Sequence, residues 1–415
     1  MNNIPPGYKQ TEVGVIPEDW EIGRLERFWA VTDCKHVTAK FVDNGFPIAS
    51  ILEVQSRFVD LTNAKQTTQE FYRLLTDGGR KPKAGDLILS RNATVGEVAQ
   101  VAEWHPLFAL GQDVCLLRKG SPEFSTDHLQ AVFRSPIIAN QLSDLMVGST
   151  FKRVNVQQIK NIIIPMPPPI EQQAIAEALS DADAFIASLG RLIAKKRQVK
   201  QGAMQELLTG RRRLPGFSGE WEVKRLDAVS EIRSGGTPST SQPDFWDGDI
   251  LWCTPTDITA LSGRKYLSQT ARTITAQGLK ASSAELIPAQ SVVMTSRATI
   301  GECAMNTVPV ATNQGFKNFT PFQDIDGEFL YYLLQTKKQD FISLCGGSTF
   351  LEIGKTQLSA FEIKLPKEKP EQTAIATILS DMDAEIAALE AKLVKARQVK
   401  QGMMQELLTG RIRLV

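Results

Sequence analysis

Apolar residues recur along two segments of the chain in alternating steps of four and three positions. The segments begin near residues 171 and 371. This spacing is typical of a helix that buries a narrow apolar stripe against another helix, as in a coiled coil. Each helix would contain about 38 residues and extend roughly 55 Å at 1.5 Å per residue. The apolar positions are Ile175, Leu179, Ala182, Ile186, Leu189 and Ile193, and then Ile375, Leu379, Met382, Ile386, Leu389 and Leu393.

Prolines and glycines mark the expected ends of both helices. Prolines at 167–169 and at 370 precede the two segments, and Gly210 and Gly410 follow them. Proline suits the first turn of a helix, and glycine suits the position just after the last turn. The acidic residues Asp181/Asp183 and Asp381/Asp383 are two positions apart and point to different sides of a helix, so we expect no shared metal ion and interpret them as solvated positions.

The two helical segments are copies of each other. Residues 171–211 and 371–411 are identical at 28 of 41 positions at an offset of 200, which indicates an internal duplication. We predict that the two helices pair antiparallel, which would bury both stripes and relate the flanking modules by a pseudo-two-fold rotation. The alternative is that each helix packs only on its own module.

The rest of the chain forms two more variable modules of about 150 residues. Short aliphatic and β-branched runs bounded by Gly, Pro and Asn predict β-rich modules, with helices near 127–146 and 326–345. We therefore predict an α+β fold. The predicted domains are residues 1–168 and 213–368 for the two β-rich modules, and residues 169–212 and 369–415 for the two helical segments.

Composition narrows the class of protein. The chain has 415 residues and a net charge of +1, so its total charge does not demand a nucleic-acid partner. Five scattered cysteines and three histidines form no metal-ligand spacing, which predicts neither a zinc site nor a disulfide framework. Cysteines without a disulfide framework fit a reducing cytoplasm best. No apolar run approaches the roughly 20 residues of a membrane span.

One short motif raises the question of nucleotide binding. Residues 345–358 read CGGSTFLEIGKTQL, and Gly354-Lys355-Thr356 is similar to the end of a phosphate-binding loop. That motif requires a glycine at position 349, which is threonine. Residues 146–159, MVGSTFKRVNVQQI, repeat the segment without the Gly-Lys-Thr. The shared element is therefore Gly-Ser-Thr-Phe, and an ATP-dependent enzyme is the less favoured hypothesis.

The duplicated pattern as a whole resembles the specificity subunit of type I restriction–modification enzymes. The residues that carry this resemblance are the W-E-x-x-x-L openings at 20–25 and 221–226, the SRNATVGE and SRATIGE loops, the Gly-Ser-Thr-Phe repeats, and the QVKQG-x-MQELLTGR helix ends. Module two also has GGTPSTSQPDFWDGDILWCTPTDI at 235–258. Module one has VTDCKHVTAKFVDNGFPIASILEV at 31–54 instead, so contacts of this loop do not transfer directly between the modules.

The resemblance implies a DNA-binding subunit that performs no chemistry. Each β-rich module would be a target-recognition domain that reads one half of an asymmetric bipartite site in double-stranded DNA. The helices would set the gap between the halves and bind two adenine-methyltransferase subunits, with restriction–translocase subunits completing the complex. We expect no catalytic residue, metal or cofactor on this chain. S-adenosylmethionine, ATP and Mg²⁺ are expected on the partner subunits.

Candidate DNA contacts come from loops rich in the side chains that read bases and hold phosphates. In module one they are Arg91, Asn92, Thr94, Gln112, Ser149, Thr150, Lys152 and Arg153. In module two they are Arg233, Thr237, Ser239, Arg297, Thr299, Asn313, Gln314, Ser348, Thr349 and Lys355. Each of these residues could instead serve only turn formation or surface solvation.

The two sets share some residues and differ in others. Arg91 and Arg297 both follow a serine, so we pair them as counterparts. Shared residues cannot distinguish two different half-sites and are expected to hold the phosphate backbone or the fold. Residues that differ, such as Arg153 against Glu352, are better candidates for reading sequence.

The repeated helix ends are the predicted docking site for the methyltransferase subunits. The candidate residues are Met204, Leu207, Leu208, Met404, Leu407 and Leu408. A hypothesis from another class also remains open at this point. The chain could be a duplicated protein-interaction scaffold without DNA readout, which a net charge near zero would suit.

Overall fold

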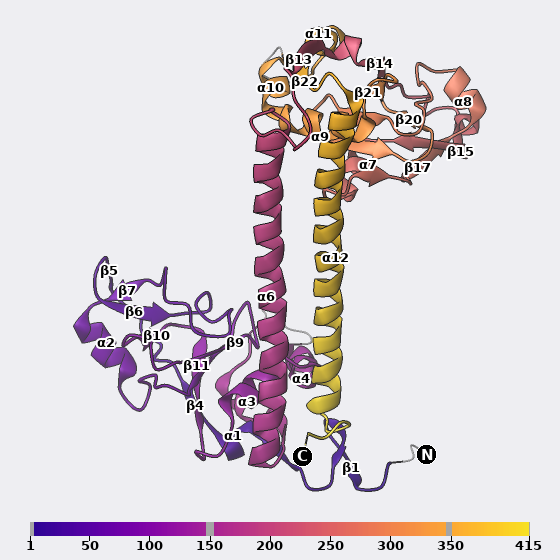
Figure 1. Ribbon diagram of the computed structural model, residues 1–415. Helices are drawn as coiled ribbons and strands as arrows, with labels where there is room; N and C mark the ends of the chain where they lie inside the picture. Colours follow the sequence, from indigo (N-terminus) through magenta and orange to yellow (C-terminus); the bar gives the residue numbers. More distant parts are fainter. Residues whose placement is uncertain (1–3, 147–152, 346–350, 415) are drawn as a thin grey trace. The chain divides into compact units, whose positions relative to one another are not determined.

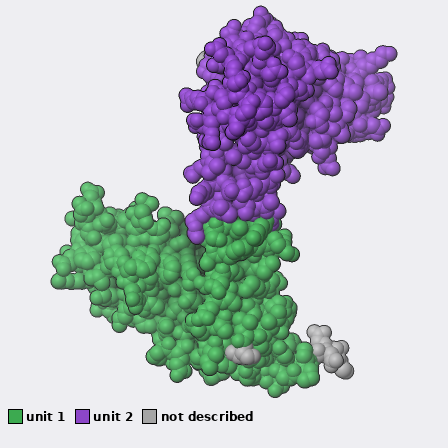
Figure 2. All heavy atoms as spheres, viewed as in Figure 1, with its two compact units in different colours: residues 1–190, 392–415 green, residues 191–391 purple. Residues whose placement is uncertain are grey.

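The computed structural model describes residues 4–146, 153–345 and 351–414. Backbone contacts divide the chain into two compact units, residues 1–190 with 392–415 and residues 191–391 (Figure 2). Each unit contains one β-rich domain together with part of each long helix. The predicted α+β fold with two β-rich modules is confirmed.

The two long helices begin and end at equivalent positions. Helix α6 (Pro169–Leu207) and helix α12 (Lys369–Leu407) each have 39 residues. In unit 1, Asp183 pairs with Lys400 at 2.5 Å and Glu171 pairs with Arg413 at 2.6 Å. From Asp183 back to Glu171 along α6, the partner advances from Lys400 to Arg413, so the helices run antiparallel as predicted (Figure 1).

Unit 2 repeats these contacts with the two helices exchanged. Asp383 of α12 pairs with Lys200 of α6 at 2.5 Å, and Glu371 pairs with Arg213 at 2.6 Å. Every residue is 200 positions from its counterpart in unit 1. The acidic residues at 183 and 383 are therefore ion-paired across the helices, and our interpretation of them as merely solvated is wrong.

The domain of unit 1 contains two four-stranded sheets and two strand pairs. One sheet has the order β4–β11–β8–β9, and the other has the order β10–β6–β7–β5. The strands are β1 (Tyr8–Thr11), β2 (Gly14–Pro17), β3 (Glu21–Arg24), β4 (Trp29–Asp33), β5 (Phe41–Val42), β6 (Phe46–Ala49), β7 (Gln66–Thr67), β8 (Leu87–Ser90), β9 (Val98–Gln100), β10 (Ala109–Leu110), β11 (Val114–Lys119) and β12 (Ile163–Met166). The helices are α1 (Leu25–Phe28), α2 (Gln69–Thr76), α3 (Thr126–Phe133), α4 (Pro136–Met146) and α5 (Val156–Lys160).

The domain of unit 2 is built on a five-stranded sheet of order β14–β21–β18–β19–β16 and a three-stranded sheet of order β17–β15–β20. The strands are β13 (Glu222–Arg225), β14 (Ser230–Ser234), β15 (Trp246–Cys253), β16 (Tyr266–Leu267), β17 (Arg272–Ile274), β18 (Val292–Thr295), β19 (Cys303–Asn306), β20 (Val310–Thr312), β21 (Phe316–Pro321) and β22 (Glu362–Leu365). The helices are η1 (Leu226–Ala228), η2 (Pro243–Phe245), α7 (Pro255–Ala260), α8 (Ala276–Lys280), α9 (Gly327–Thr336), α10 (Lys338–Ser343) and α11 (Lys355–Ala360).

The central strands of both main sheets are continuous apolar runs because both of their faces are covered. All four residues of β8 and all four residues of β18 are buried. Their neighbours β11 and β21 occupy the same place in the two sheets, antiparallel to β8 and β18. The two domains therefore share one core arrangement despite their divergent loops.

The ends of the long helices belong to the cores of the units. In unit 1, Ile175 of α6 and Leu407 of α12 lie in one hydrophobic cluster with Trp20. In unit 2, Ile375 and Leu207 lie in the equivalent cluster. Each helix therefore packs both on the module that precedes it and on the other helix, which combines our two hypotheses. Across the described ranges, no helix has a stretch long and apolar enough to cross a membrane.

Candidate nucleic-acid interface

A tight loop follows the central strand of each domain. The loops span residues 91–96 and 296–301, and each contains an alanine with left-handed backbone, Ala93 with φ of 55° and Ala298 with φ of 56°. This conformation is uncommon for residues other than glycine, and such strain concentrates at functional sites. The two domains therefore hold the same unusual loop at the same place.

Backbone hydrogen bonds align the two loops residue by residue. Ser90 N donates to Glu97 O at 2.8 Å, and Thr295 N donates to Glu302 O at 2.9 Å. Counting inward from these pairs places Arg297 at the position of Asn92. The pairing of Arg91 with Arg297 that we took from the sequence is therefore wrong by one residue.

Arg91 is a buried structural residue. Its side chain is 3% exposed, and its Nη2 lies 2.7 Å from the Asp33 carboxylate and 3.7 Å from Cys34 Sγ. We expected Arg91 to contact DNA, but in this structure its guanidinium is enclosed by the domain. Its real counterpart in module two is Ser296, which is also buried.

Arg91 also bears on a possible metal site. The ligand atoms of Asp33, Cys34 and His36 lie within 4.8 Å of one another. The guanidinium of Arg91 already neutralises this group, and burial raises the pKa of the Cys34 thiol, which favours its protonated form. The arrangement therefore suits an ion pair between the buried Arg91 and the half-buried Asp33 better than a metal ion.

The structure brings four of the module-one candidates together. Asn92 and Arg153 face each other as a β-bridge, and both side chains contact Asp113, at 3.3 Å and 3.2 Å. Gln112 precedes Asp113 and is exposed, and Thr94 lies in the same loop as Asn92. These residues form a half-exposed polar cluster with amide, guanidinium and hydroxyl groups.

Module two places different chemistry at the equivalent position. Arg297 and Glu352 form the equivalent β-bridge, and their side chains form an ion pair at 2.9 Å. Thr299 and Lys355 are exposed nearby, in the same loop and at the start of α11. The two domains thus present asparagine beside arginine in one case and arginine beside glutamate in the other.

The remaining module-two candidates surround the end of strand β14. Thr237 donates a hydrogen bond to the side chain of Gln314, which follows Asn313 in the loop before β21. Ser239 is exposed two residues further on. Arg233 is held by Glu231 at 2.7 Å, so it is largely neutralised within the domain. Thr237, Gln314 and Ser239 are the more accessible hydrogen-bonding groups here.

Five predicted DNA contacts lie outside the described residues, and their positions stay a prediction. They are Ser149, Thr150, Lys152, Ser348 and Thr349.

The predicted docking residues at the helix ends lie in different surroundings. Leu207 and Leu407 are 6% and 4% exposed, and Leu208 and Leu408 are 2% and 0% exposed. These four leucines stabilise the core of the unit in which they lie and offer no surface to a partner. This corrects our expectation for them, because the helix end turns its last apolar residues into the adjoining domain. Met204 and Met404 are half-buried against the same cores. Their docking role stays a prediction.

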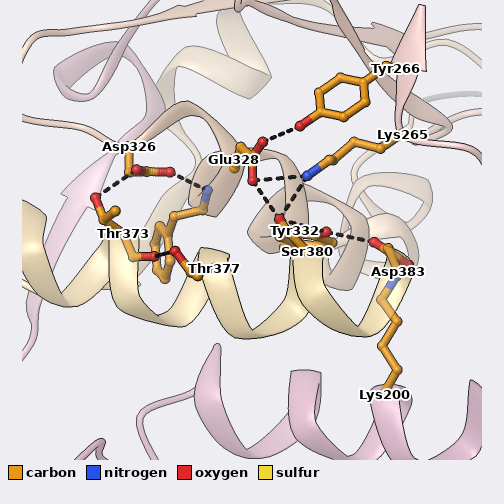
Figure 3. A network of polar contacts seen from close by, with 11 residues as sticks. Lys200, Lys265, Tyr266, Asp326, Glu328, Tyr332, Thr373, Thr377, Ser380 and Asp383 are labelled. Carbon is orange, nitrogen blue, oxygen red and sulfur yellow. Dashed lines mark hydrogen bonds and ion pairs between the residues drawn. The ribbon is translucent and has the colours of Figure 1, made fainter. Parts of the chain in front are cut away.

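A polar network that our sequence reasoning missed joins the domain of unit 2 to α12 (Figure 3). Glu328 accepts contacts from Lys265 at 2.9 Å and Ser380 at 2.5 Å. Tyr332 donates to Asp383 at 2.6 Å, and Lys200 of α6 contacts the same carboxylate. The network fixes one end of the domain to both helices.

Unit 1 has an equivalent network with different residues. Arg57 donates to Ser180 of α6 and to Asp127 of α3, both at 2.9 Å. Ser180 and Ser380 are counterparts in the helical repeat, so the helix contributes the same hydroxyl in both units. The repeated Ser-Asp-x-Asp segment was the available signal, but the module residues that bind it share no motif.

Comparisons with known proteins bear on both domains. A family model described as the type I restriction modification DNA specificity domain matches residues 17–196 and again 218–396. The chain is 26% identical over 433 residues to a putative type I restriction enzyme MjaX specificity subunit of Methanocaldococcus jannaschii, covering 98% of this chain and 97% of that protein. It is 40% identical over 166 residues to the MjaIX specificity subunit of the same organism, covering 40% of this chain and 38% of that protein.

Solved structures share the fold. The HsdS subunit from Thermoanaerobacter tengcongensis has a TM-score of 0.56 at 20% identity, covering 96% of this chain and 98% of that chain. A chain from a study of complex assembly and conformational transition of the type I R-M system has a TM-score of 0.65 at 19% identity, covering 96% of this chain and 99% of that chain.

Proposed function

The chain belongs to the family of type I restriction–modification DNA specificity subunits, and on that premise we propose that each of its two domains reads one half of a bipartite DNA site. The observation that carries this proposal is the equivalence of Asn92 and Arg297. Two domains of one fold have different side chains at the same position of the strained loop, and both are of types that can hydrogen-bond to base edges. Asparagine pairs best with adenine and arginine with guanine, so the two halves of the site would differ in sequence.

The loops around these two residues suit a nucleic-acid surface. Hydroxyl and amide groups such as Thr94, Thr299 and Gln314 are of the kind that hold phosphates and base edges. The hydrogen bond from Asn92 to Asp113 and the ion pair of Arg297 with Glu352 would hold the two reading side chains in place before DNA binds. Less side-chain freedom is then lost on binding.

The long helices would set the gap between the two half-sites and bind the partner subunits. Two methyltransferase subunits would dock, because the exposed residues of both helix ends are nearly identical. Restriction–translocase subunits would join the full complex. S-adenosylmethionine, ATP and Mg²⁺ would belong to those partners, and this chain would contribute specificity without catalysis.

The test is to express the chain with its methyltransferase subunit and map N6-methyladenine across the host genome. We expect one motif with two unlike halves and a constant gap. Inserting one heptad into both α6 and α12 is expected to change the gap and leave the bases of both halves unchanged. Methylation at a single contiguous motif, or altered bases with an unaltered gap, would refute the proposal.

A further inference from the structure

The sheets β10–β6–β7–β5 and β17–β15–β20, here called the second sheets, can be aligned through their hydrogen bonds. Strand β10 runs parallel to β6, and β20 runs parallel to β15. Just beyond these strands, Gly111 N donates to Ala49 O at 2.8 Å, and Asn313 N donates to Cys253 O at 3.0 Å. Gly111 and Asn313 are therefore equivalent, and the residue that follows each of them is a glutamine.

That glutamine contacts a threonine in both domains. Gln112 donates to the hydroxyl of Thr38 at 3.4 Å, and the hydroxyl of Thr237 donates to Gln314. Both glutamines are exposed. The two threonines come from loop segments that share no sequence motif. The fold therefore places the same pair of polar groups at this point of each domain.

An aromatic ring also occupies equivalent positions in the second sheets. Thr67 of β7 and Ile274 of β17 each pair with two residues of the preceding chain. The first of these two is Phe41 for Thr67 and Trp246 for Ile274. Phe41 and Trp246 are therefore counterparts. The residues two positions before Thr67 and Ile274 are counterparts as well, and both are cations.

Each of these cations lies over its aromatic ring. Lys65 Nζ is 4.9 Å from the centre of the Phe41 ring, and Arg272 Cζ is 3.6 Å from the centre of the Trp246 ring. Both cations are exposed, and neither is ion-paired with a carboxylate in the part of the chain that the structure describes. The face of an aromatic ring attracts a cation and limits the freedom of its side chain. Each domain thus holds one unpaired positive charge in a defined place.

The cation and the threonine–glutamine contact belong to one surface in each domain. In module two, the ring beneath Arg272 also fixes the threonine loop, because Trp246 Nε1 donates to Ser239 O at 3.1 Å. In module one, Thr67 pairs with the ring residue and donates its hydroxyl to Lys40 O at 2.8 Å. Ser239 and Lys40 each follow the loop threonine by two residues. The second sheet of both domains therefore gathers an exposed cation, a hydroxyl and an amide.

We propose that Lys65 and Arg272 each bind one phosphodiester of the DNA backbone beside the half-site read by their own module. This inference rests on the proposed function and adds two residues that no loop motif reveals. The two positions share a positive charge but not a side chain, and lysine lacks the planar fork of arginine. Charge alone suits phosphate, which is the same beside every base sequence. The contacts therefore add affinity in both modules without changing the recognised bases.

The decisive variants are Lys65→Met and Arg272→Met, with Arg27→Met as the matched control. Arg27 also lies over a ring, 5.2 Å from the centre of Phe28, but it is ion-paired with Glu21 at 2.8 Å. The complex with the methyltransferase subunit is titrated with a duplex that carries its mapped motif, by fluorescence anisotropy at several salt concentrations. For K65M and R272M we expect about tenfold weaker binding at low salt. The slope of log affinity against log salt should become shallower by about one. R27M should match wild type in both measurements.

Conservative variants and a second duplex distinguish a phosphate contact from other roles. Lys65→Arg and Arg272→Lys keep the charge and should keep the wild-type salt slope. In K65M and R272M, the ratio of affinities for the motif duplex and for a duplex with one altered half-site should equal the wild-type ratio. The free chains of both methionine variants should melt close to wild type, because the replaced side chains are exposed.

Three results would count against these contacts. Wild-type affinity and salt slope in K65M or R272M would overturn the phosphate contact of that module and leave its cation a packing role only. A changed base in the methylated motif of either variant would overturn the contact as well, because the residue would then read sequence. If the wild-type complex does not prefer its own motif duplex, the proposed function fails, and both phosphate contacts fail with it.

Discussion

His128 makes the stability of unit 1 sensitive to mild acid. It lies in the first turn of α3, 1% exposed, and neither ring nitrogen has a hydrogen-bond partner among the described residues. Its counterpart in unit 2 is Phe329 of α9, 0% exposed. Both residues donate their backbone N–H to the residue that caps the helix, Ser125 and Asp326 respectively. The perturbation is therefore His128→Phe, which puts the residue of unit 2 into unit 1.

The magnitude follows from the pKa of the imidazole. Burial lowers the pKa of His128 from 6.5 to about 4. The unfolded chain then binds a proton at a pH where the folded chain does not, so stability is lost as the pH falls below about 6.5 and the loss levels off below about 4. Between pH 7 and about 4.5 this one group removes roughly 2 kcal/mol of unfolding free energy. Carboxylates titrate as well, but equally in both proteins.

The chain is unfolded with urea at each pH, and unfolding is monitored by hydrogen exchange. Peptides of α3 report on unit 1, and peptides of α9 report on unit 2. The stability advantage of H128F over wild type should grow by roughly 2 kcal/mol between pH 7 and about 4.5 in unit 1. Any change in packing adds a constant that does not depend on pH. The reciprocal variant, Phe329→His, should introduce the same acid sensitivity into unit 2. A pH-independent difference between H128F and wild type would refute the reasoning.

Three other predictions test the helix ends and the loop of module two. Glu171→Ala should destabilise its unit by about 1–3 kcal/mol more than Glu371→Ala in urea unfolding. The reason is that Glu171 also accepts a hydrogen bond from the buried N–H of Trp20, whereas the equivalent N–H of Trp221 has no partner among the described residues. Equal losses would contradict this. Leu408→Ala should lower the unfolding free energy of the isolated chain by about 2–5 kcal/mol, since the leucine is fully buried in the core of unit 1. If the substitution weakens the complex with the methyltransferase subunit but leaves the isolated chain equally stable, Leu408 docks the partner after all. Gly235→Ala would place a Cβ 1.8 Å from the carbonyl oxygen of Asn313, so it should cost about 1–3 kcal/mol and impair methylation of one half-site, with the other half unchanged.

Local and repeated features of this protein could be predicted from its sequence. The spacing of apolar residues defined the two long helices, because helical periodicity is a property of neighbouring residues. The prolines before residues 171 and 371 and the duplication located their starts. The antiparallel pairing followed as well, since two closely similar apolar stripes on one chain are best buried against each other.

Only the tertiary structure decided which side chains are buried and which residues of the two domains occupy equivalent positions. Arg91 is a basic residue beside a polar loop, yet its neighbours in the sequence do not reveal that other segments of the domain enclose its side chain. The sequence aligned Arg297 with Arg91 because both residues follow a serine. The backbone hydrogen bonds of the two loops show that Arg297 occupies the position of Asn92. Leu208 looked free because the apolar stripe had ended, but the adjoining domain covers it. Periodicity is encoded between neighbours, while the surroundings of a side chain depend on segments that only folding brings together.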